Sequence, residues 1–259
     1  MTLVQSAIIV ALTVGCALRA RHWSARRQSR PLTFALAALI VGQLGRVPGV
    51  NRALDAVPVL PDGLASIIGN AAQLAALAAI AIHALTALRL ANRLTMLTNL
   101  AAAGFFGLAA TYVLDTIGQF SAGFADDPLA FQWLILTGMD VTACSLMARA
   151  CYVGLDGADA WQRAVLLSWL TAAVCGLTAD AIRVYEVITP GVSAFGAGSV
   201  YAARMSSLLL AVGVILLELY REGNRTDGMG RTATKRALPR HVPRRRRSQA
   251  FRRNVFEEG

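Results

Sequence analysis

Apolar residues fill long runs of the chain, and polar positions gather between those runs. A helix needs about 17 to 25 apolar residues to cross roughly 30 Å of hydrocarbon. This pattern predicts an all-α protein, a seven-transmembrane helix bundle over residues 1–220, followed by a tail over 221–259. The predicted spans cover approximately residues 2–18, 31–47, 64–88, 96–118, 129–150, 162–188 and 195–220.

The first two spans are the least regular. Span 2–18 has neither a charged leader nor a small-residue cleavage site ahead of its basic flank, so we expect it to be retained. The second offers only fifteen residues, "PLTFALAALIVGQLG", before Arg46. We therefore expect either that Arg46 extends outward toward the interface or that this helix tilts little. No proline interrupts the middle of a span, which favours a plain bundle over broken transporter helices.

Composition and charge support a membrane protein and give it an orientation. The chain is 56% hydrophobic and 15% charged, far from a typical soluble composition. Five arginines lie between the first two spans, four in the later loops on that side and twelve basic residues after residue 220, so 21 of the 25 Lys and Arg share one side. The positive-inside rule then places the N-terminus outside and the C-terminus in the cytoplasm.

Several charged residues lie inside the spans, in the half nearer the outside. A charge at mid-bilayer costs about 2.5 to 3.5 kcal/mol, so such residues usually turn inward and pair. We expect Arg204 to pair with Asp140 or Asp180. Arg183 can also pair with Asp180, one helical turn away. The candidate intramembrane polar cluster comprises Asp115, Asp140, Asp180, Arg183, Glu186 and Arg204.

Two interpretations of this cluster stay open. It is either a structural ion-pair network that fixes how the last four spans dock, or a site. Its four acids outnumber its two arginines, so a surplus carboxylate could hold a proton or bind a cation from outside. Nearby, Asn70 and Gln73 are expected to form interhelical hydrogen bonds rather than to hold a ligand.

The sequence offers no motif for catalysis, a metal or a cofactor. The four cysteines lie within spans without CxxC spacing, and the three histidines are scattered. There is no P-loop, G-x-S-x-G or zincin pattern, so we predict no enzyme activity. The only lysine is Lys235 in the tail, which excludes a retinal Schiff base within the bundle.

The tail is strongly basic and contains two prolines without periodic apolar residues, so we expect disorder in isolation. Beside a negatively charged leaflet, each basic residue contributes about 1 kcal/mol of attraction. Anionic lipid headgroups are the favoured partner, with a cytoplasmic protein as the alternative; nucleic acid is disfavoured because no groove-reading fold accompanies the arginines. The candidate binding residues are Lys235, Arg236, Arg240, Arg244, Arg245, Arg246, Arg247, Arg252 and Arg253.

Two segments resemble a large actinobacterial family of seven-helix membrane proteins of unknown function. The run from "RPLTFALAALIVGQLGRVPG" to "PDGLASIIGNAAQL" is similar to its second and third spans, and "WQRAVLLSWLTAAVCGLTADAIRVYEVI" to its sixth, with Arg183 and Tyr185 at an "R.LY"-like end. This chain has "PDGLA" where relatives have "PNLA", and a short basic tail where many have a soluble region. The resemblance implies a multi-pass protein of the bacterial plasma membrane, in either a signalling or a transport context.

These observations lead to a functional expectation with one alternative. We expect a non-enzymatic sensor or scaffold whose basic tail contacts anionic lipid or a partner. The alternative is a small transporter or channel that uses the outer acidic cluster.

The orientation gives the first testable prediction. A fluorescent reporter that folds only in the cytoplasm should be bright when fused after Gly259, because the arginine-rich side is retained inside. Alkaline phosphatase, which is active only outside, should be inactive at the same position. The reverse pair of signals would contradict the predicted topology.

Overall fold

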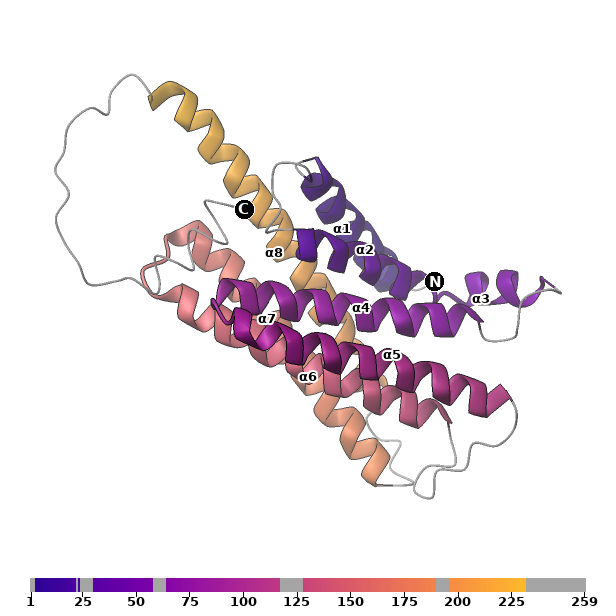
Figure 1. Ribbon diagram of the computed structural model, residues 1–259. Coiled ribbons are helices and arrows are strands. Elements are labelled where there is room, and N and C mark those ends of the chain that lie inside the picture. The colour runs from indigo at the N-terminus through magenta and orange to yellow at the C-terminus, as the bar shows by residue number, and fades with distance from the viewer. Residues whose placement is uncertain are drawn as a thin grey trace.

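The computed structural model describes residues 3–21, 23, 30–57, 64–116, 128–189 and 196–231, and within these ranges it contains helices and turns but no strand. The long helices pack against one another, and the short α3 lies at one end of them, as Figure 1 shows. A short 3₁₀ turn, η2, covers Ala91–Arg93. The α-helices are α1 (Leu3–Ala20), α2 (Arg30–Leu44), α3 (Pro48–Asp55), α4 (Leu64–Ala87), α5 (Leu94–Thr116), α6 (Pro128–Leu155), α7 (Ala160–Ile188) and α8 (Gly196–Arg231).

Six of the described helices are long and apolar enough to cross a membrane, and there are seven spans if α2 and α3 are counted as one bent span. The predicted second span ends early, at Leu44. Val47 has an extended backbone, the conformation favoured before a proline, and Pro48 then starts α3 at an angle of 68° to α2. The last helix instead runs past residue 220 to Arg231, so the predicted tail begins as helix.

Six helices form a closed ring in the order α1, α2, α4, α6, α7, α8, with α8 packed back on α1. α5 lies outside this ring, on α4 and α6. Its Gly104 and Gly107 lie against Leu74 and Ile135, at distances where a methyl group would crowd these side chains. Small residues at such positions let membrane helices approach closely.

Contacts between helices give the relative directions of α1, α2 and α8. Gln5 near the start of α1 donates a hydrogen bond to the Gln43 carbonyl near the end of α2, so these helices are antiparallel. Arg19 near the end of α1 contacts Glu218 in α8, so α1 and α8 run in the same direction. We call the end of the bundle where Arg19 and Glu218 meet the tail end.

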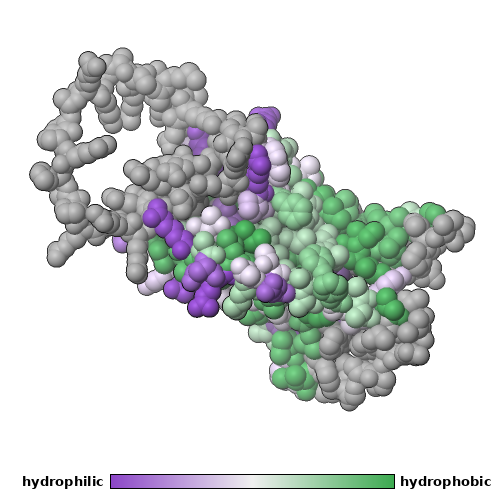
Figure 2. Space-filling model, in the orientation of Figure 1, coloured by the Kyte–Doolittle hydropathy of each residue, from purple (hydrophilic) through white to green (hydrophobic). Residues whose placement is uncertain are grey.

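The surface of the described residues is largely apolar, as expected for helices that face lipid chains. Large apolar side chains such as Phe106 and Tyr152 are more than three-quarters exposed. Figure 2 shows hydrophobic residues over most of the described surface in that view, with hydrophilic residues gathered toward the tail end. Four arginines near the tail-end connections are exposed there: Arg89 and Arg93 between α4 and α5, Arg149 near the end of α6 and Arg163 near the start of α7. This distribution fits a multi-pass membrane protein.

Glycines bring α2 and α4 into backbone contact. A Cβ on Gly45 would lie 2.8 Å from the Ala65 carbonyl oxygen and 3.0 Å from the Gly69 Cα. A Cβ on Gly42 would lie 3.3 Å from the Gly69 carbonyl oxygen. Only glycine permits this approach, which fixes the chain just after α2 against the start of α4.

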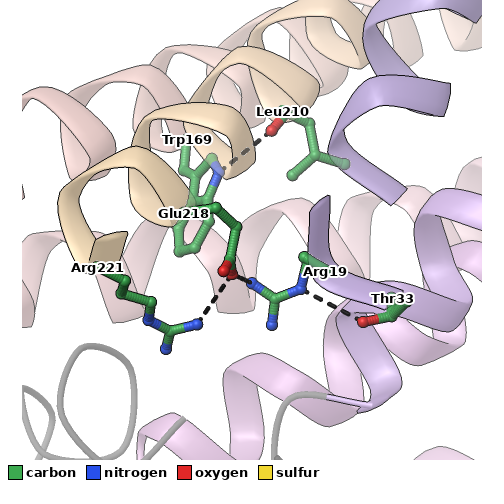
Figure 3. A network of polar contacts seen from close by, with 6 residues as sticks. All are labelled: Arg19, Thr33, Trp169, Leu210, Glu218 and Arg221. Atoms are coloured by element: carbon green, nitrogen blue, oxygen red, sulfur yellow. Dashed lines mark hydrogen bonds and ion pairs between the residues drawn. The ribbon is translucent and has the colours of Figure 1, made fainter. Parts of the chain in front are cut away.

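A buried ionic network joins the helices at the tail end. Glu218 accepts from Arg19 at 2.8 Å and from Arg221 at 3.0 Å, and these three side chains are at most 6% exposed. Arg19 also donates to the Thr33 hydroxyl at 3.4 Å, and about two turns earlier in α8 the Leu210 carbonyl accepts from the Trp169 indole (Figure 3). The sequence pattern had placed Arg19 in a basic loop and Arg221 in the tail. Both are instead interior residues, because each shares the Glu218 carboxylate.

A second tail-end contact ties the start of α7 to α8. The Asp159 carboxylate accepts from the Gln162 backbone N–H at 2.8 Å and caps α7, while the Gln162 side chain accepts from the Asp159 backbone. The Tyr220 hydroxyl donates to Asp159 at 3.0 Å and accepts from Gln162 at 3.1 Å. The capping box therefore also anchors α8.

The ionic network gives a stability prediction. Glu218→Gln removes the carboxylate that both buried arginines contact, and loss of one partner of a buried pair typically costs about 3 to 5 kcal/mol. We expect a lower midpoint of thermal unfolding in mild detergent. Arg163→Gln, at an exposed tail-end position of α7, is the control and should change the midpoint little. Equal midpoints for the two variants would contradict the role of the network.

Candidate functional site

A cavity of about 420 Å³ lies inside the ring, in the half opposite the tail end. All six ring helices contribute to its wall, and no residue of α5 does. Ser66 near the start of α4 and Arg46 just after α2 line it, so the cavity reaches the end of the bundle. Small-molecule sites usually measure about 300 to 1,000 Å³.

Helical spacing places the polar groups on this wall. In α4, Asn70, Gln73 and Leu77 recur every three to four residues and share one face. In α8, Arg204 and Ser207 share a face in the same way. The lining is amide-rich and hydroxyl-rich near the open end and apolar deeper, where it consists of Leu77, Ile80, Met147 and Leu210.

Two arginines of the wall flank one tryptophan. The guanidinium carbon of Arg46 lies 5.2 Å from the centre of the Trp133 ring, and that of Arg183 lies 4.7 Å from it. Arg46 also donates a hydrogen bond to the Gln73 side chain. The contact between α2 and α4 places Arg46 on the cavity wall, where Gln73 and Trp133 hold it. Two like charges are tolerated here because each is attracted to the ring face.

Two acids of the predicted cluster are described near these arginines, Asp140 and Asp180. Asp180 is 1% exposed and pairs with Arg183 at 3.6 Å, one turn along α7, which confirms that predicted pair. Within the described residues neither Asp180 oxygen accepts a hydrogen bond. Asp140 lines the cavity and accepts from the Cys144 thiol at 3.2 Å.

Arg204 does not form the predicted pair. Within the described residues, neither Asp140 nor Asp180 lies within 4.0 Å of its guanidinium, and it makes no other ion pair or hydrogen bond. α6 and α8 pack mainly on α7 rather than on each other, so Asp140 and Arg204 line the cavity from different walls. The cavity occupies the space where the ion pair was expected.

The described charges of the wall are mostly positive. Its described charged residues are Arg46, Arg183 and Arg204 against Asp140 alone. Asp115 and Glu186, which supplied the predicted acidic surplus, have side chains outside the described residues. Sequence reasoning missed Arg46 and Trp133 as members of the site. The nearest signal was a pair of amides, Asn70 and Gln73, in an otherwise apolar span.

The remaining predictions concern Asn70, the cysteines and the tail, and the structure describes the first two. Asn70 donates to Gln132 across α4 and α6 at 3.0 Å, which confirms the expected interhelical bond. All four cysteines are free, and the described residues contain no group of three potential metal ligands. The predicted lipid-binding residues of the tail, from Lys235 to Arg253, lie outside the described ranges.

A second, much smaller cavity of about 20 Å³ lies toward the tail end beside His83. Ile80, Met147 and Leu210 line both cavities and thus separate them with apolar side chains. Neither ring nitrogen of His83 has a hydrogen-bond partner within the described residues, although both are buried. Polar groups therefore occur on both sides of a thin apolar layer.

No protein-family model, curated protein or solved structure matches this chain. The resemblance to the actinobacterial seven-helix family is thus an expectation that rests on the sequence segments alone.

The arrangement around Trp133 gives a prediction for site stability. Trp133→Leu removes the ring that faces two guanidiniums, and each such contact is worth about 0.5 to 2 kcal/mol. We expect the thermal midpoint to fall in the order wild type, Trp133→Phe, Trp133→Leu, because phenylalanine keeps a weaker ring face. Trp161→Leu, at an exposed position of α7, should stay near wild type. Equal losses for the phenylalanine and leucine variants would show that the ring face contributes nothing.

Proposed function

We propose that this protein is a non-enzymatic, multi-pass membrane protein of sensor type that binds a small polar molecule in the cavity. In this proposal the cavity faces the outside, and the basic end of α8 and the tail contact anionic lipid or a partner protein in the cytoplasm. The arginine asymmetry supports this orientation.

The observation that carries the proposal is Arg204. A charge within the span is costly unless it is paired or faces water, and such residues commonly mark ligand or ion sites. Arg204 faces a cavity and has no ion-pair partner among the described residues. A purely structural network would be expected to pair this guanidinium.

One helix connects the cavity with the tail end. α8 carries Arg204 in the cavity wall and Glu218 in the ionic network, about 21 Å apart at roughly 1.5 Å per residue. A ligand that moves α8 relative to α1 would alter the Arg19–Glu218 contact. Binding on one side could thereby be signalled to the tail on the other.

A transporter is the second candidate. The apolar layer of Ile80, Met147 and Leu210, with polar residues on both sides of it, favours this alternative. Opening of this layer would connect the cavity with His83 and the tail end. The sensor proposal has this layer closed, whereas transport needs it to open.

Cysteine labelling separates the two candidates. In a variant whose four native cysteines are replaced by serine, Ser207→Cys places a thiol on the cavity wall. A membrane-impermeant thiol reagent should label it from outside in intact cells. Val212→Cys, on the exposed apolar surface of α8, should remain unlabelled in lipid.

The side of labelling decides the outcome. Labelling from outside alone supports the sensor, and labelling from both sides in inverted vesicles supports the transporter. If Ser207→Cys is as unreactive as Val212→Cys from both sides, the cavity is closed to water and both proposals fail.

A further inference from the structure

We propose that the cavity binds a small organic oxyanion, a carboxylate or a phosphate monoester with a compact apolar body. This inference rests on the proposed function and specifies its ligand class. The sequence left open a structural network or a site for a proton or a cation, whereas the described charges of the wall favour an anion.

The first argument is charge. Three arginines and one aspartate are the described charged residues of the wall, and the Asp180 carboxylate behind Arg183 offsets only part of the excess. Away from bulk water, charges interact more strongly than in solution. A positive wall of this kind stabilises an anion and repels a cation.

The second argument is the availability of donors. Arg46 already contacts Gln73 and Trp133, which hold its guanidinium at the wall. Arg183 is held in the same way by Asp180 and Trp133. Arg204 has no such contact among the described residues, so its planar fork can bond both oxygens of a carboxylate or phosphate. The geometry points to Arg204 as the direct ligand, with the other two arginines adding attraction.

The third argument is the apolar floor. Leu77, Ile80, Met147 and Leu210 close the deep part of the cavity toward the tail end. A fully hydrated inorganic anion would offer these side chains no apolar surface to pack against. An organic anion can place its charged group beside the arginines and its apolar body on this floor.

Four probes with one ring and different charges test the ligand class. The full-length protein in phosphatidylcholine nanodiscs is titrated by calorimetry with benzoate, phenyl phosphate, benzyl alcohol and benzylammonium. We expect at least one anion to bind about tenfold more tightly than benzyl alcohol, the gain from one charge-assisted contact. Benzylammonium should bind more weakly than the alcohol.

Two substitutions locate the site. Arg204→Gln should lower anion affinity about tenfold, while Arg204→Lys keeps the charge and should retain part of that affinity. Arg163→Gln, at an exposed tail-end position, should leave the affinity unchanged. Each variant is first checked for a single monodisperse peak in size exclusion, and Arg204→Lys against wild type carries the test if the glutamine variant does not fold.

The source of the anion is decided by adding phosphatidic acid, a lipid whose headgroup is a phosphate monoester, to the nanodiscs. If the lipid displaces the bound probe from wild type in an Arg204-dependent manner, the oxyanion is a lipid headgroup. If the lipid does not displace the probe, the oxyanion is a soluble one.

The inference is overturned if neither anion binds more tightly than benzyl alcohol, or if Arg204→Gln and Arg204→Lys both bind anions like wild type. If benzylammonium or benzyl alcohol instead protects Ser207→Cys from labelling, the ligand class is wrong while the proposed function stands. If no probe protects a labelled Ser207→Cys and no anion binds, the ligand class is wrong and small-molecule binding loses its support.

Discussion

The high free-energy cost of leaving a charged side chain in hydrocarbon explains where the charged residues of this protein lie. Each described charge inside the ring must meet an opposite charge, an aromatic face or a cavity. At the tail end the charges meet opposite charges, because Glu218 lies between Arg19 and Arg221. In the opposite half an ion pair, an aromatic face and a cavity occur together. The cavity distinguishes this bundle from one whose centre is fully packed.

The ring of helices explains why the cavity lies where it does. α1, α2, α4, α6, α7 and α8 each pack on the next, while α5 remains outside. Gly42, Gly45 and Gly69 hold α2 and α4 together, and Gly213 lets the Trp169 ring lie against α8. These contacts close the sides of the ring but leave its centre to polar side chains. The same contacts turn Arg46 inward, which changes the charge of the wall.

α8 links the two halves of the bundle because it contributes residues to both the cavity and the ionic network. It contributes Arg204 to the cavity, Leu210 to the apolar floor and Glu218 to the ionic network. It also continues to Arg231, toward the basic tail. A conformational signal or an alternating-access movement would each require a shift of this helix. The apolar layer around Leu210 is the element on which the two proposed functions differ.

The sequence by itself determined the helical class, the number of apolar segments, the asymmetry of the arginines and the pair between Asp180 and Arg183. These properties depend on composition, run length and the three-residue spacing of one helix, all of which are local. Only the tertiary structure decided that Arg204 lacks the expected partner, that Arg46 faces Trp133, and that Arg19 and Arg221 are interior residues. Such contacts join residues far apart in the chain, and they depend on how each helix is rotated and packed. Because rotation of a helix decides whether a charge meets a partner or a cavity, no pattern along one segment could have fixed the charge of the site.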